Sequence, residues 1–157
     1  MIYIAHRGNF AGRNLIRENE QSYLMEAYMK GFHVEIDIWS VNRKWYFGHD
    51  APQYEINERD VLHYGYKENT FSFTTSKWFF HCKNEEAMER LSYRTNVCYF
   101  WHENDQYAVT NTGHIWTTKL DAVAQNAIVM VVNPADITKV NSRVHGICTD
   151  DFRGLEK

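Results

Sequence analysis

Two acidic residues, Glu35 and Asp37, are separated by a single residue in an alternating segment that predicts a β-strand. Residues two apart on a strand point to the same face, about 6.6 Å from one another at a rise of ~3.3 Å per residue. If Val34, Ile36 and Ile38 pack on the other face, both carboxylates point into an interior where unpaired negative charge is heavily penalised. A bound divalent cation would relieve that penalty, whereas an edge strand facing water would need no ion. The segment by itself leaves both interpretations open.

Three of the eight histidines, His6, His49 and His81, each fall at the C-terminal end of a predicted strand. Parallel α/β folds build their sites at that end, which makes these side chains candidates for acid/base chemistry. Arg7 follows His6 and carries a guanidinium suited to phosphate oxygens. Lys83 lies two residues after His81, so a strand would send both side chains to one face. Acid/base groups, oxyanion-binding cations and metal ligands are together the requirements of phosphodiester cleavage.

The elements that must position these residues alternate in type. Helical spacing predicts a helix over residues 18–30, with Asn19 as its N-cap and Gly31 just beyond its last turn. A second helix is predicted over residues 84–93, with Asn84 as its N-cap. The order strand, helix, strand at the start of the chain favours a parallel α/β arrangement.

Strands outnumber helices in the pattern. Residues 52–75 lack a clear period and are interpreted as loop with some short structure, and no linker or repeat divides residues 1–157, which predicts one domain. A regular (β/α)8 barrel takes ~250 residues, whereas this length leaves about 20 per unit, so such a barrel would lack helices. Eight strands are expected at residues 2–5, 34–39, 44–48, 78–83, 97–101, 115–118, 127–132 and 146–149.

The composition of the chain limits the kinds of partner that it is expected to bind. The chain has 157 residues, of which 17 are basic and 20 acidic, and its net charge of −3 argues against a nucleic-acid groove or an anionic membrane surface. Its apolar stretches are far shorter than the ~20 residues that span a bilayer, and its apolar start is too short for a signal peptide. We therefore expect a cytoplasmic protein without membrane insertion. Three scattered cysteines, Cys82, Cys98 and Cys148, indicate buried reduced thiols rather than disulfides or a CxxC zinc site.

The candidate residues also resemble a known family in their order. The H-R-G, E-N-T, E-x-D and H-D elements of the glycerophosphodiester phosphodiesterase signature are matched, at nearly the same spacing, by His6-Arg7-Gly8, Glu18-Asn19, Glu35-x-Asp37 and His49-Asp50. Farther along, residues 80–83 resemble the family's E-x-K strand and residues 146–150 its closing G-I-x-T-D strand. The resemblance implies an α/β fold, namely a reduced TIM-type barrel with about eight strands and several outer helices shortened or missing.

The same resemblance implies a metal-dependent phosphodiesterase that hydrolyses a small glycerophosphodiester to glycerol phosphate and an alcohol. His6 and His49 would form the acid/base pair, with His6 as the base and His49 as the acid. Arg7 and Lys83 would hold the phosphate. No nucleic acid is expected as a partner, and the sequence does not indicate an oligomeric state.

The metal ligands implied by the resemblance are Glu35 and Asp37, with Mg2+ or Ca2+ as the ion. Where the family usually has a third carboxylate ligand, this sequence has His81. That histidine can supply a nitrogen ligand, leave a water in that position or weaken the metal site. Glu20 replaces the usual Thr of the E-N-T element, at a position expected to be helical and exposed.

Other activities fit the same residues. A related phosphoryl transfer, such as a lyase that cyclises a lysophospholipid or acts on a glycerophosphoryl group of a surface polymer, would differ only in its pocket. A metal-free nuclease with two histidines would use His6 and His49 but would give Glu35 and Asp37 no role. A noncatalytic phosphate-binding module is a further alternative, because the third acid is lost. An amidohydrolase barrel is disfavoured because no HxH follows the first strand.

A few residues stand at the margin of the predicted site. His102, Glu103 and Asp150 fall at or just beyond strand ends and can reach the same pocket. Aromatic residues make up 15% of the chain, so the rings either fill a core with few residues or cover strand surfaces that absent helices would have buried. Trp39 and Trp116 can also stack on a substrate, although packing in the core is the simpler interpretation.

Overall fold

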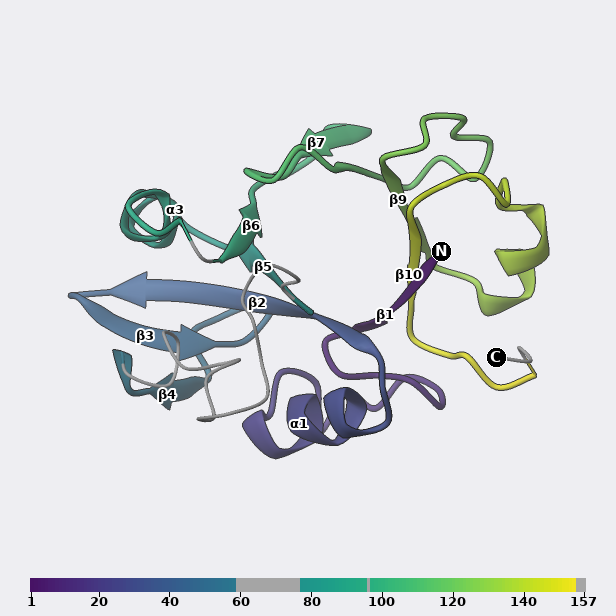
Figure 1. Cartoon of the computed structure of the whole chain (residues 1–157). Coiled ribbons are helices and arrows are strands. Elements are labelled where there is room, and N and C mark those ends of the chain that lie inside the picture. Colours follow the sequence, from purple (N-terminus) through teal and green to yellow (C-terminus); the bar gives the residue numbers. More distant parts are fainter. Residues whose placement is uncertain (59–76, 96, 155–157) are drawn as a thin grey trace, which may run out of the picture.

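The computed structural model describes residues 1–58, 77–95 and 97–154. In these ranges the chain is a mixed α/β protein with one strongly curled sheet and few helices (Figure 1). The helices are α1 (Gln21–Met29), α3 (Glu85–Ser92) and the 3-10 helix η2 (Pro134–Lys139). The strands are β1 (Ile2–His6), β2 (His33–Val41), β3 (Lys44–Phe47), β4 (Tyr54–Ile56), β5 (Trp78–Cys82), β6 (Cys98–Phe100), β7 (Tyr107–Val109), β8 (Ile115–Thr117), β9 (Ala127–Val131) and β10 (Gly146–Thr149).

Seven of the described strands run parallel, in the spatial order β6, β5, β2, β1, β10, β9 and β8. The second half of β2 also pairs with β3 in an antiparallel hairpin, and β3 pairs with β4. At the other end of the sheet, β7 is antiparallel to β8. Because the central strands are parallel, their C-terminal ends all lie at one edge of the sheet, the edge at which α/β proteins carry their sites.

The two ends of the curled sheet meet through Asn111, which follows β7. Its backbone N–H donates to the carbonyl of Tyr99 on β6 at 3.0 Å, and its side-chain oxygen accepts from the Tyr99 N–H at 2.8 Å. The side-chain amide donates in turn to the carbonyl of Val97 at 2.8 Å. One asparagine therefore satisfies backbone groups of β6 that would otherwise form an open sheet edge.

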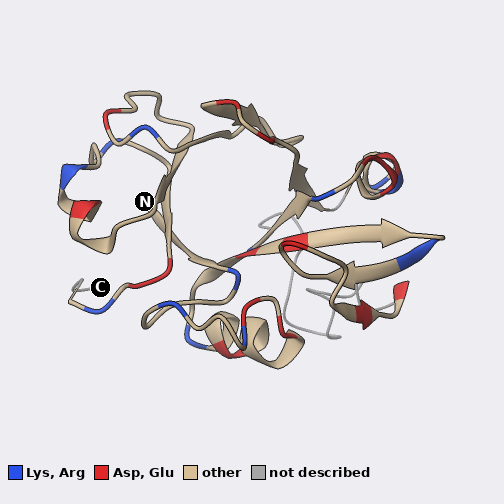
Figure 2. Ribbon diagram, turned by 180° about the vertical axis from the view of Figure 1, so that it is seen from behind, with Lys and Arg blue, Asp and Glu red and all other residues tan. Residues whose placement is uncertain are grey.

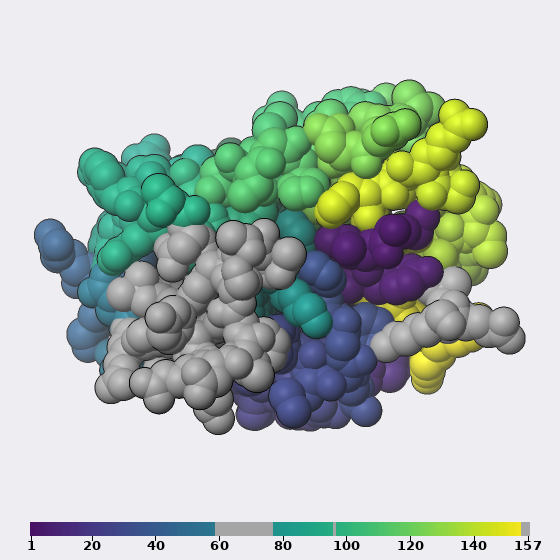
Figure 3. All heavy atoms as spheres, in the orientation of Figure 1, coloured from purple at the N-terminus to yellow at the C-terminus, as the bar shows by residue number. Residues whose placement is uncertain are grey.

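Alternation along the strands sorts the side chains to two faces. The outer face includes Val34, Ile36 and Ile38 of β2, as the sequence predicts, and α1 packs against it. Side chains from seven strands around the sheet contact one another on the inner face, so this second cluster lies inside the curl. Its buried members are Ile4, Phe79, Cys98, Phe100, Ala108, Trp116, Ile128 and Cys148. Figure 3 shows one face of the molecule with all heavy atoms as spheres, in the orientation of Figure 1.

The inner apolar cluster ends at a polar layer. Two residues beyond Ile4 on β1 stands His6, and two residues beyond Phe79 on β5 stands His81. With a period of two, each pair shares the inner face of its strand. The interior is therefore apolar at the N-terminal ends of the strands and ionisable at their C-terminal ends.

Aromatic rings from β1 and from the segments that follow β1, α1 and β10 cover part of the outer face. Phe32 stacks on Phe152 with ring centroids 5.0 Å apart, and Phe10 stacks on Phe32 at 5.8 Å. Tyr3 of β1 contacts Phe152 edge-on at 5.5 Å. These contacts agree with the expectation that bulky rings bury strand surface in place of outer helices.

The predicted helices need one correction. The first begins at Gln21, and Asn19 is not its N-cap: Asn19 is buried with a left-handed φ of 62°, and its side chain bonds elsewhere. The N-cap position is held by Glu20, which forms no capping hydrogen bond through its side chain. The second helix is confirmed, including its cap, since the Asn84 side chain accepts from the Ala87 N–H.

The predicted strands are all present in the described residues, but the pattern missed two. The short β7 was not expected, and β4 lies in the segment interpreted as loop. Residues 59–75 of that segment lie outside the described residues. All three cysteines are buried and free, as expected. The described part of the chain has no helix that meets the length and hydropathy of a membrane span.

Candidate active site

The C-terminal ends of the strands surround a cavity of about 560 Å³. Six of the seven residues that the sequence predicts for the site line it, and the seventh, Asp37, is fully buried beside them. Figure 2 shows acidic segments on β2 and just after β10, with the basic segment that follows β1 near them. The six lining residues are His6, Arg7, Glu35, His49, His81 and Lys83.

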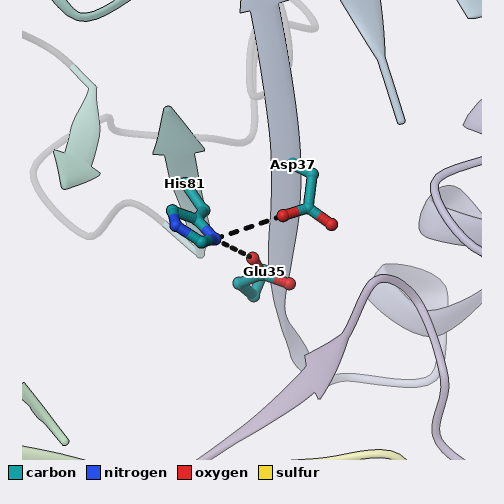
Figure 4. Close-up of side chains that lie close together, drawn as sticks. All are labelled: Glu35, Asp37 and His81. Carbon is teal, nitrogen blue, oxygen red and sulfur yellow. Dashed lines mark ion pairs between the residues drawn. The ribbon is translucent and has the colours of Figure 1, made fainter. Parts of the chain in front are cut away.

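The centre of the site is a cluster of Glu35, Asp37 and His81 from the neighbouring strands β2 and β5 (Figure 4). His81 Nδ1 lies 3.2 Å from Asp37 Oδ1 and 3.7 Å from Glu35 Oε1. One donor atom from each residue lies within 4.8 Å of the other two. The alternating pattern of β2 therefore does send both carboxylates inward, and the water-facing interpretation of that strand is wrong for Glu35 and Asp37, which are 1% and 0% exposed.

Asp37 is surrounded by positive and polar groups. Its Oδ2 forms an ion pair with Arg7 Nε at 2.9 Å and accepts from the Asn19 side-chain amide at 3.0 Å. Lys83 Nζ lies 3.7 Å from Oδ1. Burial alone would raise the pKa of Asp37, but His81, Arg7 and Lys83 hold it well below its usual range. Asp37 is therefore an anion at neutral pH.

Glu35 has a less favourable environment than Asp37. Its carboxylate accepts from the Arg7 backbone N–H at 3.2 Å, and His6 Nε2 lies 3.9 Å from Oε2. Burial and the nearby charge of Asp37 raise its pKa above the usual value, and His6, His81 and Arg7 only partly offset them. The two carboxylates thus share one interior while their pKa values move in opposite directions, which indicates a shortage of positive charge beside Glu35.

Asp37 also provides a test of whether a cation fits. Its Oδ1 is buried, and no donor among the described residues makes a well-directed hydrogen bond to it. That oxygen lies 3.2 Å from His81 Nδ1, on the side of the carboxylate that faces the cluster. Two carboxylate oxygens and an imidazole nitrogen are common metal ligands, so the residues present fit a divalent ion held by Glu35, Asp37 and His81.

His6 is oriented by a carboxylate from the other end of the chain. Its Nδ1 lies 2.8 Å from Asp150 Oδ1, and the Asn9 amide donates to the same oxygen at 2.9 Å. Burial lowers the pKa of His6, but the hydrogen bond with Asp150 and the charge of Glu35 outweigh it, so the pKa is raised. With Nδ1 on Asp150, Nε2 is left to exchange a proton in the cavity.

His49 has a contrasting environment. It follows β3 and Gly48, is partly exposed, and has its Nδ1 2.7 Å from Asp50 Oδ1. Burial lowers its pKa, and Arg7 and Lys83 lower it further, against the opposing charge of Asp37. Both predicted acid/base histidines thus line one cavity, with pKa values displaced to opposite sides of the usual one.

Arg7 lies in a turn that only particular backbone angles allow. Arg7 and Gly8 both have positive φ, 53° and 85°, and a Cβ at Gly8 would approach Tyr23 Cδ1 to 3.1 Å. The guanidinium is buried, with Nη1 on Glu18 at 3.1 Å and Nε on Asp37. Arg7 therefore lines the cavity, but its guanidinium is already paired with Glu18 and Asp37. Its main role is to hold the Asp37 carboxylate in place, and phosphate binding is secondary.

Several residues of the cavity were not in the predicted core of the site. Arg13 lines it, with half of its side chain exposed and Nε on Glu18 at 2.9 Å, and no motif marked it. His102, Glu103 and Asp150 line the cavity as well, in keeping with their positions at or just beyond strand ends, and so does Trp116 in the middle of β8. Trp39 does not; its indole N–H donates to the Gly48 carbonyl at 2.6 Å.

Comparison with known proteins adds no family to this description, since no family model, curated protein or solved structure matches the chain. What is defined is a mixed α/β protein with a curled sheet and a buried carboxylate–histidine cluster at the C-terminal ends of its strands.

Proposed function

We propose that the protein is a divalent-metal-dependent phosphodiesterase that hydrolyses a glycerophosphodiester, built on a reduced TIM-type barrel. The observation that carries the proposal is the meeting of three kinds of group at one cavity: the donor cluster of Glu35, Asp37 and His81, the Asp150-oriented His6 with His49, and the cation Lys83. Each kind of group has a separate task in phosphodiester cleavage.

The donor cluster would hold the ion, which when bound supplies a Lewis acid for a non-bridging phosphoryl oxygen. Lys83 and the exposed part of Arg13 offer positive charge to the remaining phosphate oxygens as negative charge grows in the transition state. Arg7 keeps Asp37 ionised and in place through its Nε ion pair. Asp150 holds the His6 ring through Nδ1, and Nε2 lies 3.9 Å from Glu35 Oε2.

The pKa directions favour one order of proton transfer. A raised pKa favours the protonated form of His6, in which the proton on Nδ1 faces Asp150 and the proton on Nε2 can pass to a leaving alkoxide. A lowered pKa favours the neutral form of His49, which can take a proton from the attacking hydroxyl or water. We therefore propose His49 as the base and His6 as the acid, the reverse of the order expected from the sequence.

This order predicts the pH dependence of kcat/KM. Activity should rise with pH as His49 loses its proton, below about pH 6.5, and fall as His6 loses its proton, above about pH 6.5. Asp150→Asn should move the alkaline limb to lower pH and leave the acidic limb in place, because the Asp150 hydrogen bond raises the pKa of His6. A shift of the acidic limb in Asp150→Asn would contradict the assignment.

Turnover of glycerophosphocholine with and without a chelator tests the function, with products followed by phosphorus NMR. The expected result is glycerol phosphate, formed only when a divalent ion is present. Cyclic phosphate as the final product would indicate a lyase, and unchanged turnover in the chelator would indicate a metal-free two-histidine enzyme. Binding of inorganic phosphate or glycerophosphocholine without turnover in any divalent metal would indicate a phosphate-binding module.

A further inference from the structure

The orientation of the His81 ring bears on which ion the cluster takes. Its Nε2 lies 3.4 Å from the carbonyl oxygen of His102, and its Nδ1 faces Glu35 and Asp37. A carbonyl only accepts, so Nε2 carries the hydrogen toward it. A neutral His81 then has its lone pair on Nδ1, directed at two carboxylate oxygens. Only a proton or a cation between the three atoms makes that arrangement favourable.

The ring is also held firmly in this orientation. It stacks in parallel on Phe100 and on His102, in each case with ring centroids 4.9 Å apart. Packing of this kind fixes the side-chain rotamer before any ligand arrives. Nδ1 is therefore presented to Glu35 and Asp37 by the fold itself.

The spacing of the three donors suits a single small ion. Ligands at ~2.0–2.2 Å from a metal are separated by about 3.0 Å at right angles and about 3.4 Å in a tetrahedron. The separations of Nδ1 from the two oxygens, 3.2 and 3.7 Å, lie near these values. The ion would have three protein ligands and the cavity on its remaining side, the pattern of a catalytic rather than a structural site.

We infer that the cluster selects a first-row transition ion such as Mn2+ or Zn2+ over Mg2+ and Ca2+. Mg2+ and Ca2+ are bound almost entirely by oxygen, whereas imidazole nitrogen favours the transition ions, least strongly Mn2+ and more strongly the later ions such as Zn2+. His81 is the residue that sets this preference, because Glu35 and Asp37 supply only oxygen. The inference rests on the metal site of the proposed function, but not on its phosphodiester chemistry.

Electron paramagnetic resonance of Mn2+ added to the full chain tests the inference. The protein is labelled with 15N at histidine Nδ1 only, because His81 presents Nδ1 to the cluster while Nδ1 of His6 is on Asp150. The expected result is a 15N coupling in the spin-echo spectrum of bound Mn2+. Competition with Mg2+ should require a large excess to displace the Mn2+.

A variant then measures the preference itself. His81→Glu replaces the nitrogen by an oxygen donor, so it should abolish the 15N coupling and lower the ratio of Mn2+ to Mg2+ affinity at least about tenfold. The matched control is His145→Glu. It makes the same change just before β10, at the N-terminal end of that strand and away from the cavity, and should keep both the coupling and the affinity ratio. If His81→Glu does not fold, the labelled wild-type protein decides the question alone.

Two of the three outcomes separate this inference from the proposed function. Mn2+ that binds without Nδ1 coupling overturns the role of His81 but leaves the metal site of the proposed function. No binding of Mn2+, Zn2+ or Mg2+ overturns both. Nδ1 coupling in a protein that does not turn over glycerophosphocholine supports the inference and contradicts the proposed function.

Discussion

Replacing His6 with Ala is expected to lower kcat for glycerophosphocholine by about 10²- to 10⁴-fold, the usual contribution of a positioned general acid or base. The reason is geometric as well as electronic. His6 is the histidine whose Nδ1 is held by Asp150 at 2.8 Å and whose Nε2 lies 3.9 Å from Glu35 Oε2. Without it the leaving alkoxide departs unprotonated. Steady-state kinetics at the pH optimum measure the loss, with KM expected to change far less than kcat.

Three companion variants make the result interpretable. Asp150→Asn keeps the His6 ring but weakens the hydrogen bond that orients it. This variant should therefore lose less activity than His6→Ala and should show the alkaline limb shifted to lower pH. His49→Ala should lose a comparable factor and also its acidic limb. His145→Ala, at the N-terminal end of β10, should retain wild-type activity. Wild-type kcat in His6→Ala would remove this histidine from the mechanism.

The sequence was sufficient to identify most of the site because each predicted residue is marked by local pattern. Glu35 and Asp37 alternate with apolar residues on one strand, and His6 and His81 end strands of the same kind. Parallel pairing then brings such ends together without further information. Six of the seven predicted residues line one cavity and Asp37 is buried next to them, while the roles given to them stay predictions.

The partners of those residues could not be predicted in the same way. Asp150 is 144 residues from His6, and its contact depends on β10 pairing with β1. Asn19 looked like a helix cap because Asn is common there, whereas the chain turns through a left-handed conformation and gives the side chain to Asp37. Local propensity does not show such a tertiary hydrogen bond, since the bond exists only once β2 is in place.

The contact that joins the two ends of the sheet could not be predicted from local pattern either. The pattern predicted strands but not what joins β6 to the far end of the sheet. That connection is made by one asparagine, Asn111, whose amide imitates a backbone group. The three-residue β7 was too short to show a period.

The two carboxylates of the cluster are expected to differ in their effect on stability, although both should be needed for metal binding. Asp37 has a lowered pKa in the folded protein, so its charge stabilises the fold above the usual pKa of an aspartate, and that contribution is lost as pH falls through the folded value. Glu35 has a raised pKa, so its charge costs stability once pH exceeds its folded value. In metal-free protein at pH 7, Asp37→Asn should therefore destabilise, and Glu35→Gln should not.

The expected loss for Asp37→Asn is about 3 kcal/mol, because it leaves the buried Arg7 guanidinium short of a counter-charge. Glu35→Gln should leave the free energy of unfolding unchanged or higher, since a Gln oxygen can still accept from the Arg7 N–H while the repulsion with Asp37 disappears. Urea unfolding with chelator present measures both, and Glu55→Gln, in an exposed pair with Lys44, is a control expected to lose less than about 1 kcal/mol. Equal losses in the two site variants would mean that Arg7 does not distinguish the carboxylates. Asp37 is therefore neutralised by Arg7, whereas the negative charge of Glu35 is only partly compensated by the protein. A cation bound to the cluster would supply the missing positive charge.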